Sequence, residues 1–138
     1  MSETSTATPP DRCPAVRVVA MPADSNAYGD IFGGWLLSLM DNAAGLVAAR
    51  RALGRAVTVA MDGMQFLEPV KIGDEVSVYG EIVRVGRTSM TIAVEAWRRP
   101  RHQDKAVKVT EAHFTFVAVD ESGRPRAVPP LAASADPS

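Results

Sequence analysis

Only one stretch of this 138-residue chain has the pattern of a long helix, and this limits the folds it can adopt. From Gly33 to about Ala52 the sequence is rich in leucine, methionine and alanine, contains no proline, and ends its pattern near Gly54. Apolar residues lie nearly all round this helix, so we expect it to be buried on most sides. After Gly54 apolar residues recur at every second position, which indicates strands.

The expected strands are joined by short turns, which predicts an antiparallel sheet. A first strand at 15–20 and a loop dense in turn formers at 21–30 precede the helix, and four more strands follow it, at 56–69, 76–85, 90–99 and 106–120. One buried helix with about five strands predicts a two-layer α+β domain, the sheet wrapped round the helix. We expect a single domain over 14–128 between disordered tails at 1–13 and 129–138.

Composition and charge exclude several classes of protein. The net charge of −1 argues against nucleic-acid binding, and the basic excess over residues 50–110 suits a small anionic ligand better than a polynucleotide. The single cysteine, Cys13, forms no internal disulfide and no cysteine-rich metal site, so a cytoplasmic location is the simplest expectation. Residues 1–13 lack the pattern of a signal peptide, and Asp41 argues against a membrane span over 31–49.

Asp41 is the residue of the helical stretch that apolar packing does not explain. In one interpretation it is the N-cap of a helix that begins at Asn42, which leaves 31–40 as a strand. In the other it is a carboxylate in the middle of the helix, in an apolar and partly closed site where it acts as a base. The absence of a turn before Asp41 favours the second interpretation.

Gly33 and Gly34 lie where the loop enters the helix. Free backbone N–H groups and the positive end of the helix dipole meet there, so the pair is suited to be an oxyanion hole. The alternative is that the glycines only ease a tight turn into the helix. Asn26, in the preceding loop, is either a turn residue or an amide that holds a water molecule or a substrate carbonyl.

Spacing along the helix then predicts a second subunit. Gly34 and Asp41 are seven residues apart, which is about 10 Å of axial rise. A base and an oxyanion hole must each lie within roughly 3 Å of the reacting group, so one helix cannot supply both to the same carbon. We therefore expect a dimer in which Asp41 of one subunit faces the helix N-terminus and the Asn26 loop of the other.

Four stretches of the chain resemble the hot-dog acyl-CoA thioesterases, and most of all the small bacterial YciA-type enzymes related to the brain-type acyl-CoA hydrolases. They are MPADSNAYGDIFGGWLLSLMD (21–41), GMQFLEPVKIGDEV (63–76), VGRTSMTIAVEAW (85–97) and TEAHFTFVAVDESGRPR (110–126). The resemblance covers about 17–128. It implies a hot-dog fold, and dimers that join sheets edge to edge and assemble into a trimer of dimers, a homohexamer.

The resemblance also implies an activity, the hydrolysis of acyl-CoA in fatty acid metabolism, with no metal or other cofactor and no nucleic-acid or membrane partner. The family's catalytic aspartate falls on Asp41 and its loop asparagine on Asn26. An N–H at Gly33 or Gly34 then polarises the thioester carbonyl. Asp41 either activates water or attacks directly, and these two routes stay open.

Coenzyme A, as part of the substrate, requires a site for its phosphates. The turn formed by Gly86, Arg87, Thr88 and Ser89 offers backbone N–H groups, hydroxyls and a guanidinium, and further basic candidates are Arg50, Arg51, Arg55, Arg98 and Lys105. Met64 and Phe66 either line an acyl tunnel or pack in the core. A non-catalytic hot-dog protein that binds acyl-CoA or CoA is the alternative function, and an interaction scaffold is a third.

Overall fold

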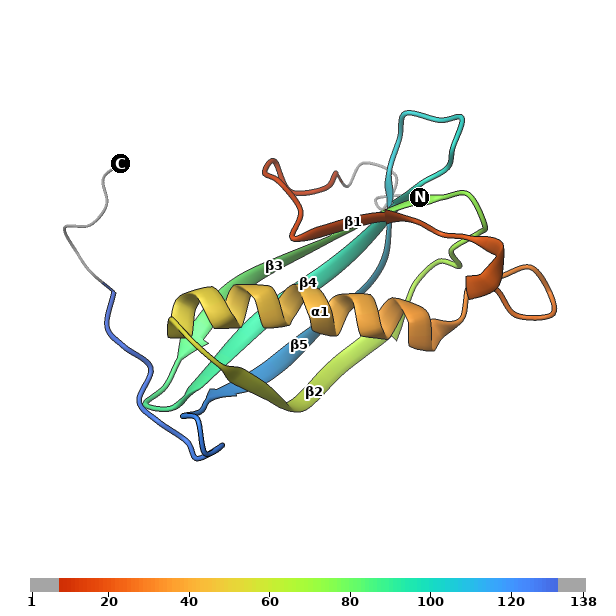
Figure 1. The fold of residues 1–138 in the computed structure, drawn as a ribbon. Helices are drawn as coiled ribbons and strands as arrows, with labels where there is room; N and C mark the ends of the chain where they lie inside the picture. The colour runs from red at the N-terminus through yellow and green to blue at the C-terminus, as the bar shows by residue number, and fades with distance from the viewer. Residues whose placement is uncertain (1–7, 132–138) are drawn as a thin grey trace.

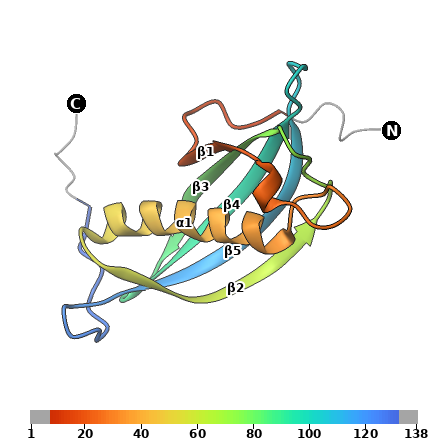
Figure 2. The ribbon, with the colours of Figure 1, turned by 45° about the vertical axis from the view of Figure 1, so that its right-hand side comes forward.

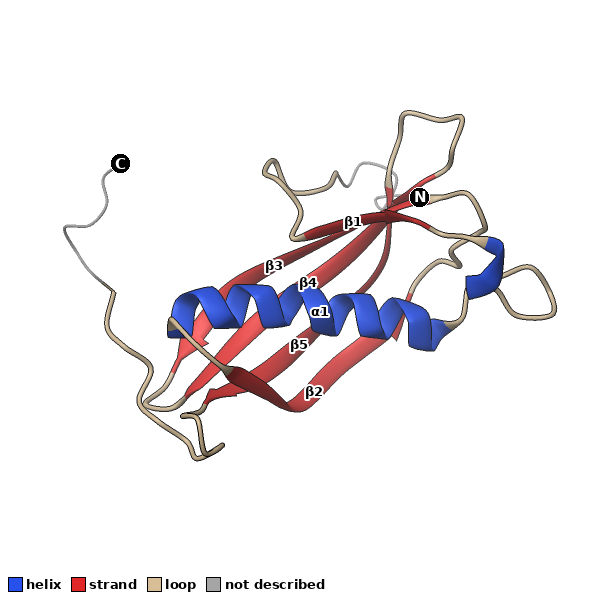
Figure 3. Ribbon diagram, in the orientation of Figure 1, coloured by secondary structure: helices blue, strands red, loops and turns tan. Residues whose placement is uncertain are grey.

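The computed structural model describes residues 8–131, and it consists of one long helix packed on one sheet. Strand β1 (Val16–Val19) and a 3-10 turn, η2 (Pro22–Asp24), precede helix α1 (Gly33–Ala52). Four strands follow, β2 (Ala56–Phe66), β3 (Glu75–Val85), β4 (Ser89–Arg99) and β5 (Val107–Ala118). Figures 1 and 3 show α1 lying along one face of the sheet. The predicted two-layer α+β architecture is therefore confirmed, whereas most of the two predicted tails lies outside the described residues.

The sheet has the strand order β1-β3-β4-β5-β2, and every neighbouring pair is antiparallel. Strands β1 and β2 are its edges, and Figure 2 shows the sheet curving round the helix. Strand β2 ends at Phe66, earlier than the predicted 69. Leu67 makes one more hydrogen bond, to the Val109 carbonyl at 2.7 Å, and Pro69 has no N–H with which to continue the ladder.

The sheet buries one side of α1. The helix residues packed in the core are Leu36, Met40, Ala43, Ala44, Ala48 and Ala52. Their spacing of three and four residues marks a single face. The expectation that most sides are buried is wrong for the single chain, because the sheet lies on one side only and Leu46 remains 50% exposed. An apolar side of α1 is thus left uncovered by the chain's own sheet.

Helix α1 spans the predicted range, from Gly33 to Ala52. Since the helix runs unbroken from Gly33, the interpretation of Asp41 as an N-cap is wrong. At the other end the left-handed residue is Leu53, with φ of 54°, and Gly54 donates to the Ala49 carbonyl at 3.2 Å. A Cβ on Gly54 would lie 2.7 Å from Nη2 of Arg126, so the end of that side chain would have to shift. No helix of the described residues is long and apolar enough to cross a membrane.

Replacing Met40 with alanine tests the packing of the helix on the sheet. Met40 is completely buried, so Met40→Ala should lower the free energy of unfolding by about 2–5 kcal/mol. Denaturant unfolding at a fixed protein concentration measures the change. Val83→Ala, at a position 50% exposed, is the control and should change it by less than about 0.5 kcal/mol. Equal effects of the two substitutions contradict the packing described here.

Candidate active site

Asp41 lies in the middle of α1, partly buried, on the side of the helix that faces β2. Its Oδ1 accepts a hydrogen bond from Oγ1 of Thr58 at 2.7 Å. Thr58 stands opposite Phe116 of β5, whose side chain is buried, so Thr58 shares the helix-facing side of the sheet. The Oδ2 atom of Asp41 has no hydrogen-bond partner within residues 8–131. One carboxylate oxygen is therefore held by Thr58, and the other has no hydrogen-bond partner among the described residues.

Thr58 is a functional candidate that the sequence analysis missed. Alternation along the strand shows which residues share a face with Thr58, and that signal was available. It does not show which residue of the strand stands opposite Asp41, because that depends on how α1 crosses the sheet. A register shift between Thr58 and Ala60 also breaks the alternation just beyond this point.

The N-terminus of α1 has two free backbone donors. Within the described residues neither Gly33 nor Gly34 has an acceptor for its N–H, and the N-cap residue, Phe32, supplies no side-chain cap. A Cβ on Gly34 would meet no atom within 4 Å, whereas a Cβ on Gly33 would lie 3.2 Å from Cζ of Phe66. Gly33 thus makes room for the Phe66 ring, and Gly34 presents bare backbone to the surface.

A cavity of about 330 Å³ lies beside this helix end. Its lining is mostly apolar and consists of Ile31, Phe32, Gly33, Leu36, Phe66, Leu67, Glu68, Pro69 and Val70. The volume is at the lower end of the range for ligand pockets, about 300–1,000 Å³. Phe66 lines the cavity and is 56% exposed, so it does not pack in the core, whereas Met64 packs against the hydrophobic core.

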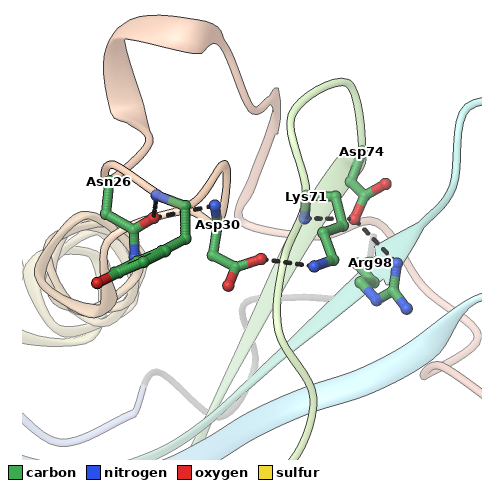
Figure 4. Close-up of polar contacts among 6 residues, drawn as sticks. Asn26, Asp30, Lys71, Asp74 and Arg98 are labelled. Carbon is green, nitrogen blue, oxygen red and sulfur yellow. Dashed lines mark hydrogen bonds and ion pairs between the residues drawn. The ribbon is translucent and has the colours of Figure 1, made fainter.

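Asn26 fixes the loop in front of the helix. Its Oδ1 accepts hydrogen bonds from the backbone N–H of Tyr28 at 2.8 Å and of Asp30 at 3.1 Å (Figure 4). Its own N–H donates to the Asp30 carbonyl at 2.7 Å. Asn26 is therefore a turn residue, as one of the two interpretations predicted, and its side-chain oxygen makes the hydrogen bonds of the turn. The side-chain Nδ2, which donates to no acceptor among the residues described, remains available for a ligand.

The turn proposed for coenzyme A lies at the opposite end of the molecule from the Asn26 loop. Strand β3 starts beside Val19, near that loop, and reaches the turn after eleven residues, a length of roughly 35 Å. The Gly86 N–H is not free for a phosphate, because it donates to the Ser89 carbonyl at 2.8 Å. The carbonyls of Arg87 and Thr88 are also bonded, to the N–H groups of Val128 and Ala118.

Two of the other basic candidates are engaged within the chain. Arg98 donates to Asp74 at 3.0 Å and Arg51 donates to the Pro129 carbonyl at 2.6 Å. His113 is exposed, while its neighbours Ala112 and Phe114 are buried, so it lies on the sheet face away from α1. Across residues 8–131 no group of three or more His, Cys, Asp or Glu side chains is placed to hold a metal ion.

The single chain therefore holds its candidate residues in three separate places. Asp41 and Thr58 lie at mid-helix, the glycine pair with the cavity and Asn26 lies at one end, and the 86–89 turn lies at the other. Among residues 8–131, strand β2 pairs with β5 alone. Its outer edge therefore presents backbone groups without a partner in this part of the chain, next to the exposed side chains of Val59 and Met61.

Comparison with known proteins identifies the family of the chain. The family model described as the thioesterase superfamily matches residues 28–105. The chain belongs to the thioesterase superfamily. It is 58% identical over 118 residues to an uncharacterized acyl-CoA thioester hydrolase of Zymomonas mobilis, a match that covers 86% of this chain and 79% of that one. It is 49% identical to the acyl-CoA thioester hydrolase YciA of Escherichia coli. That match covers 83% of this chain and 89% of the other.

A solved structure agrees with the fold of this thioesterase superfamily member. The hexameric thioesterase y2039 from Yersinia pestis superimposes with a TM-score of 0.83 at 47% sequence identity. The match covers 89% of this chain and 100% of that one. The predicted hot-dog fold and the resemblance to the YciA-type thioesterases are confirmed.

Proposed function

We propose that this chain hydrolyses acyl-CoA thioesters to a carboxylic acid and free coenzyme A. One observation carries the proposal: Asp41 is held by Thr58 through one oxygen, and the second oxygen is free. The same helix carries two free N–H groups at its N-terminus, beside an apolar cavity. The names of the Zymomonas and Escherichia relatives support an acyl-CoA thioester as the substrate.

The chemistry assigns a role to each of these groups. The N–H groups of Gly33 and Gly34 stabilise the negative charge that develops on the thioester oxygen. Asp41 takes a proton from a water molecule, whose oxygen attacks the carbonyl carbon, and the carbon–sulfur bond then breaks. The thiolate of coenzyme A leaves and is protonated. The Nδ2 of Asn26 donates a hydrogen bond to the water or to the carbonyl, so the reaction needs neither metal nor cofactor.

A second route uses the same residues. The free oxygen of Asp41 attacks the thioester carbon, coenzyme A leaves as the thiolate, and water then opens the resulting mixed anhydride. Oxygen-18 from water that enters Asp41 during a single turnover identifies the second route. If water attacks the anhydride at its aspartyl carbon, the label enters Asp41, whereas the base route puts all of the label into the released acid.

The two ends of the substrate are assigned to two regions. The acyl group or the adjoining pantetheine occupies the cavity beside Phe66, and the phosphates of coenzyme A lie against the 86–89 turn, where Arg87 is exposed. Because these regions are roughly 35 Å apart in one chain, a second subunit must bring them together.

The proposed assembly is a dimer joined through the β2 edges, and three such dimers form a hexamer. The unpaired edge of β2 and the uncovered side of α1 support a partner along this side of the molecule. The Yersinia structure, which is described as hexameric, supports the higher assembly. The single cysteine, Cys13, is consistent with a protein that works in the cytoplasm.

Asp41→Asn tests the central residue. Asparagine keeps the shape and the hydrogen bond to Thr58 but can neither accept the proton nor form the anhydride, so we expect turnover to fall at least about 100-fold. Thiol release followed with DTNB over acyl-CoAs from acetyl to palmitoyl measures it. Thermal unfolding and size-exclusion chromatography verify that the variant is folded and assembled. A wild-type protein that binds acyl-CoA tightly without releasing thiol is the non-catalytic binder instead.

Thr58→Val tests the support of the carboxylate. Valine has the shape of threonine without its hydroxyl, so Asp41 loses the group that orients it. We expect kcat to fall about tenfold, the effect of losing one hydrogen bond to a charged group. Thr58→Ser, which keeps the hydroxyl, is the matched control and should retain most of the activity. A valine variant as active as the serine variant contradicts the role of Thr58.

Mixing two strongly impaired variants tests whether the site is shared between subunits. In a dimer of one Asp41→Asn and one Asn26→Ala subunit, one shared site carries both defects and the other carries neither. Random mixing makes half of the dimers mixed, so co-expression should restore about one quarter of the wild-type activity. If each site lay within one chain, every subunit would have one defect and no activity would return.

A further inference from the structure

We propose that Asp30, Lys71 and Asp74 are positioning residues, which hold the loop of Asn26 against the sheet and so direct its free amide nitrogen. Figure 4 shows these side chains in a continuous row from the loop to Arg98 of β4. The inference rests on the proposed function, because it assigns the positioning to a reaction in which Asn26 takes part.

The row begins at the loop itself. Both backbone groups of Asp30 are hydrogen-bonded to Asn26. The Asp30 N–H donates to Oδ1 of Asn26, and the Asp30 carbonyl accepts from the backbone N–H of Asn26. The base of the loop is closed by the Phe32 N–H, which donates to the Asp24 carbonyl at 3.0 Å, whereas Tyr28 is 89% exposed. Whatever fixes Asp30 therefore also fixes the direction of the Asn26 side chain.

Lys71 fixes Asp30. Its Nζ lies 2.5 Å from Oδ1 of Asp30, and the backbones of the two residues form an antiparallel bridge. The neighbouring Ile31 N–H adds a hydrogen bond to the Val70 carbonyl at 3.0 Å. Both charged side chains are partly exposed, and ion pairs of this kind add little to overall stability. Removing the pair should therefore alter the loop without unfolding the domain.

Asp74 anchors the row in the protein interior. It is 4% exposed, and its Oδ2 accepts hydrogen bonds from the Lys71 N–H at 2.9 Å and from Nη1 of Arg98 at 3.0 Å. Its own N–H donates to the Lys71 carbonyl at 3.0 Å. Burying a carboxylate is unfavourable unless it is paired, and this one is paired with the turn that carries Lys71 and with the sheet. Arg98 thus acts as a structural partner.

Lys71→Met tests the proposal through kinetics. Methionine keeps the apolar stem and removes the charge, so the loop loses the ion pair between Lys71 and Asp30 while their backbone bridge remains. We expect kcat to fall about five- to tenfold with KM changed less than twofold, because a small misplacement of a catalytic group affects the chemical step. The matched control is Lys108→Met, which also removes an ion-paired lysine. Lys108 pairs with Glu95 and Glu111, away from the loop, so its replacement should leave kcat unchanged.

A double-mutant cycle distinguishes positioning from general weakening of the fold. If Lys71 acts through Asn26, Lys71→Met has no further effect on kcat in an Asn26→Ala background. An equal loss of kcat in both backgrounds, or a wild-type kcat for Lys71→Met, overturns the proposal.

Hydrogen exchange supplies a readout that does not depend on catalysis. The N–H groups of Tyr28 and Asp30 donate to Asn26, so their exchange should be faster in Lys71→Met, whereas amides of the sheet should be unchanged. Unchanged exchange at these two amides overturns the positioning whatever the kinetics. A wild-type protein that releases no thiol, in contrast, overturns the proposed function, and the exchange result then still decides whether Lys71 holds the loop.

Discussion

The length of a straight helix is the constraint on which the site depends. Helix α1 is unbroken from Gly33 to Ala52, and it separates its free N-terminal N–H groups from Asp41 by about 10 Å. The core holds the helix in place, because residues such as Met40 and Ala44 are completely buried and close-packed against the sheet. In the proposed mechanism both groups act on one thioester carbon, so the proposal requires that they come from different copies of the chain.

The same packing leaves surfaces that suit a partner. A single sheet covers one side of α1, so part of the helix remains apolar and open, as Leu46 illustrates. The edge strand β2 lies beside Asp41, since Thr58 bonds to its carboxylate, and this is also the strand whose outer edge is unpaired. The carboxylate of Asp41 and the edge of β2 thus lie on the same side of the domain.

The loop before the helix is held in one orientation by its contacts with the sheet. Most of its own contacts are local turns round Asn26. Its link to the sheet passes through Asp30 and Lys71 to the buried Asp74. The surface ion pair matters here for orientation, since an exposed pair contributes little to stability.

The sequence by itself determined the helix from Gly33 to Ala52, the antiparallel strands and the distance between Gly34 and Asp41, because these follow from local periodicity and fixed helical rise. It also singled out Asn26 and Phe66. Only the tertiary structure decided that Thr58 reaches Asp41, that Met64 joins the core, and that Gly86 and Arg98 are engaged within the chain. Those facts depend on strand register and on which side chains meet across the fold, and neither is encoded in the pattern of neighbouring residues.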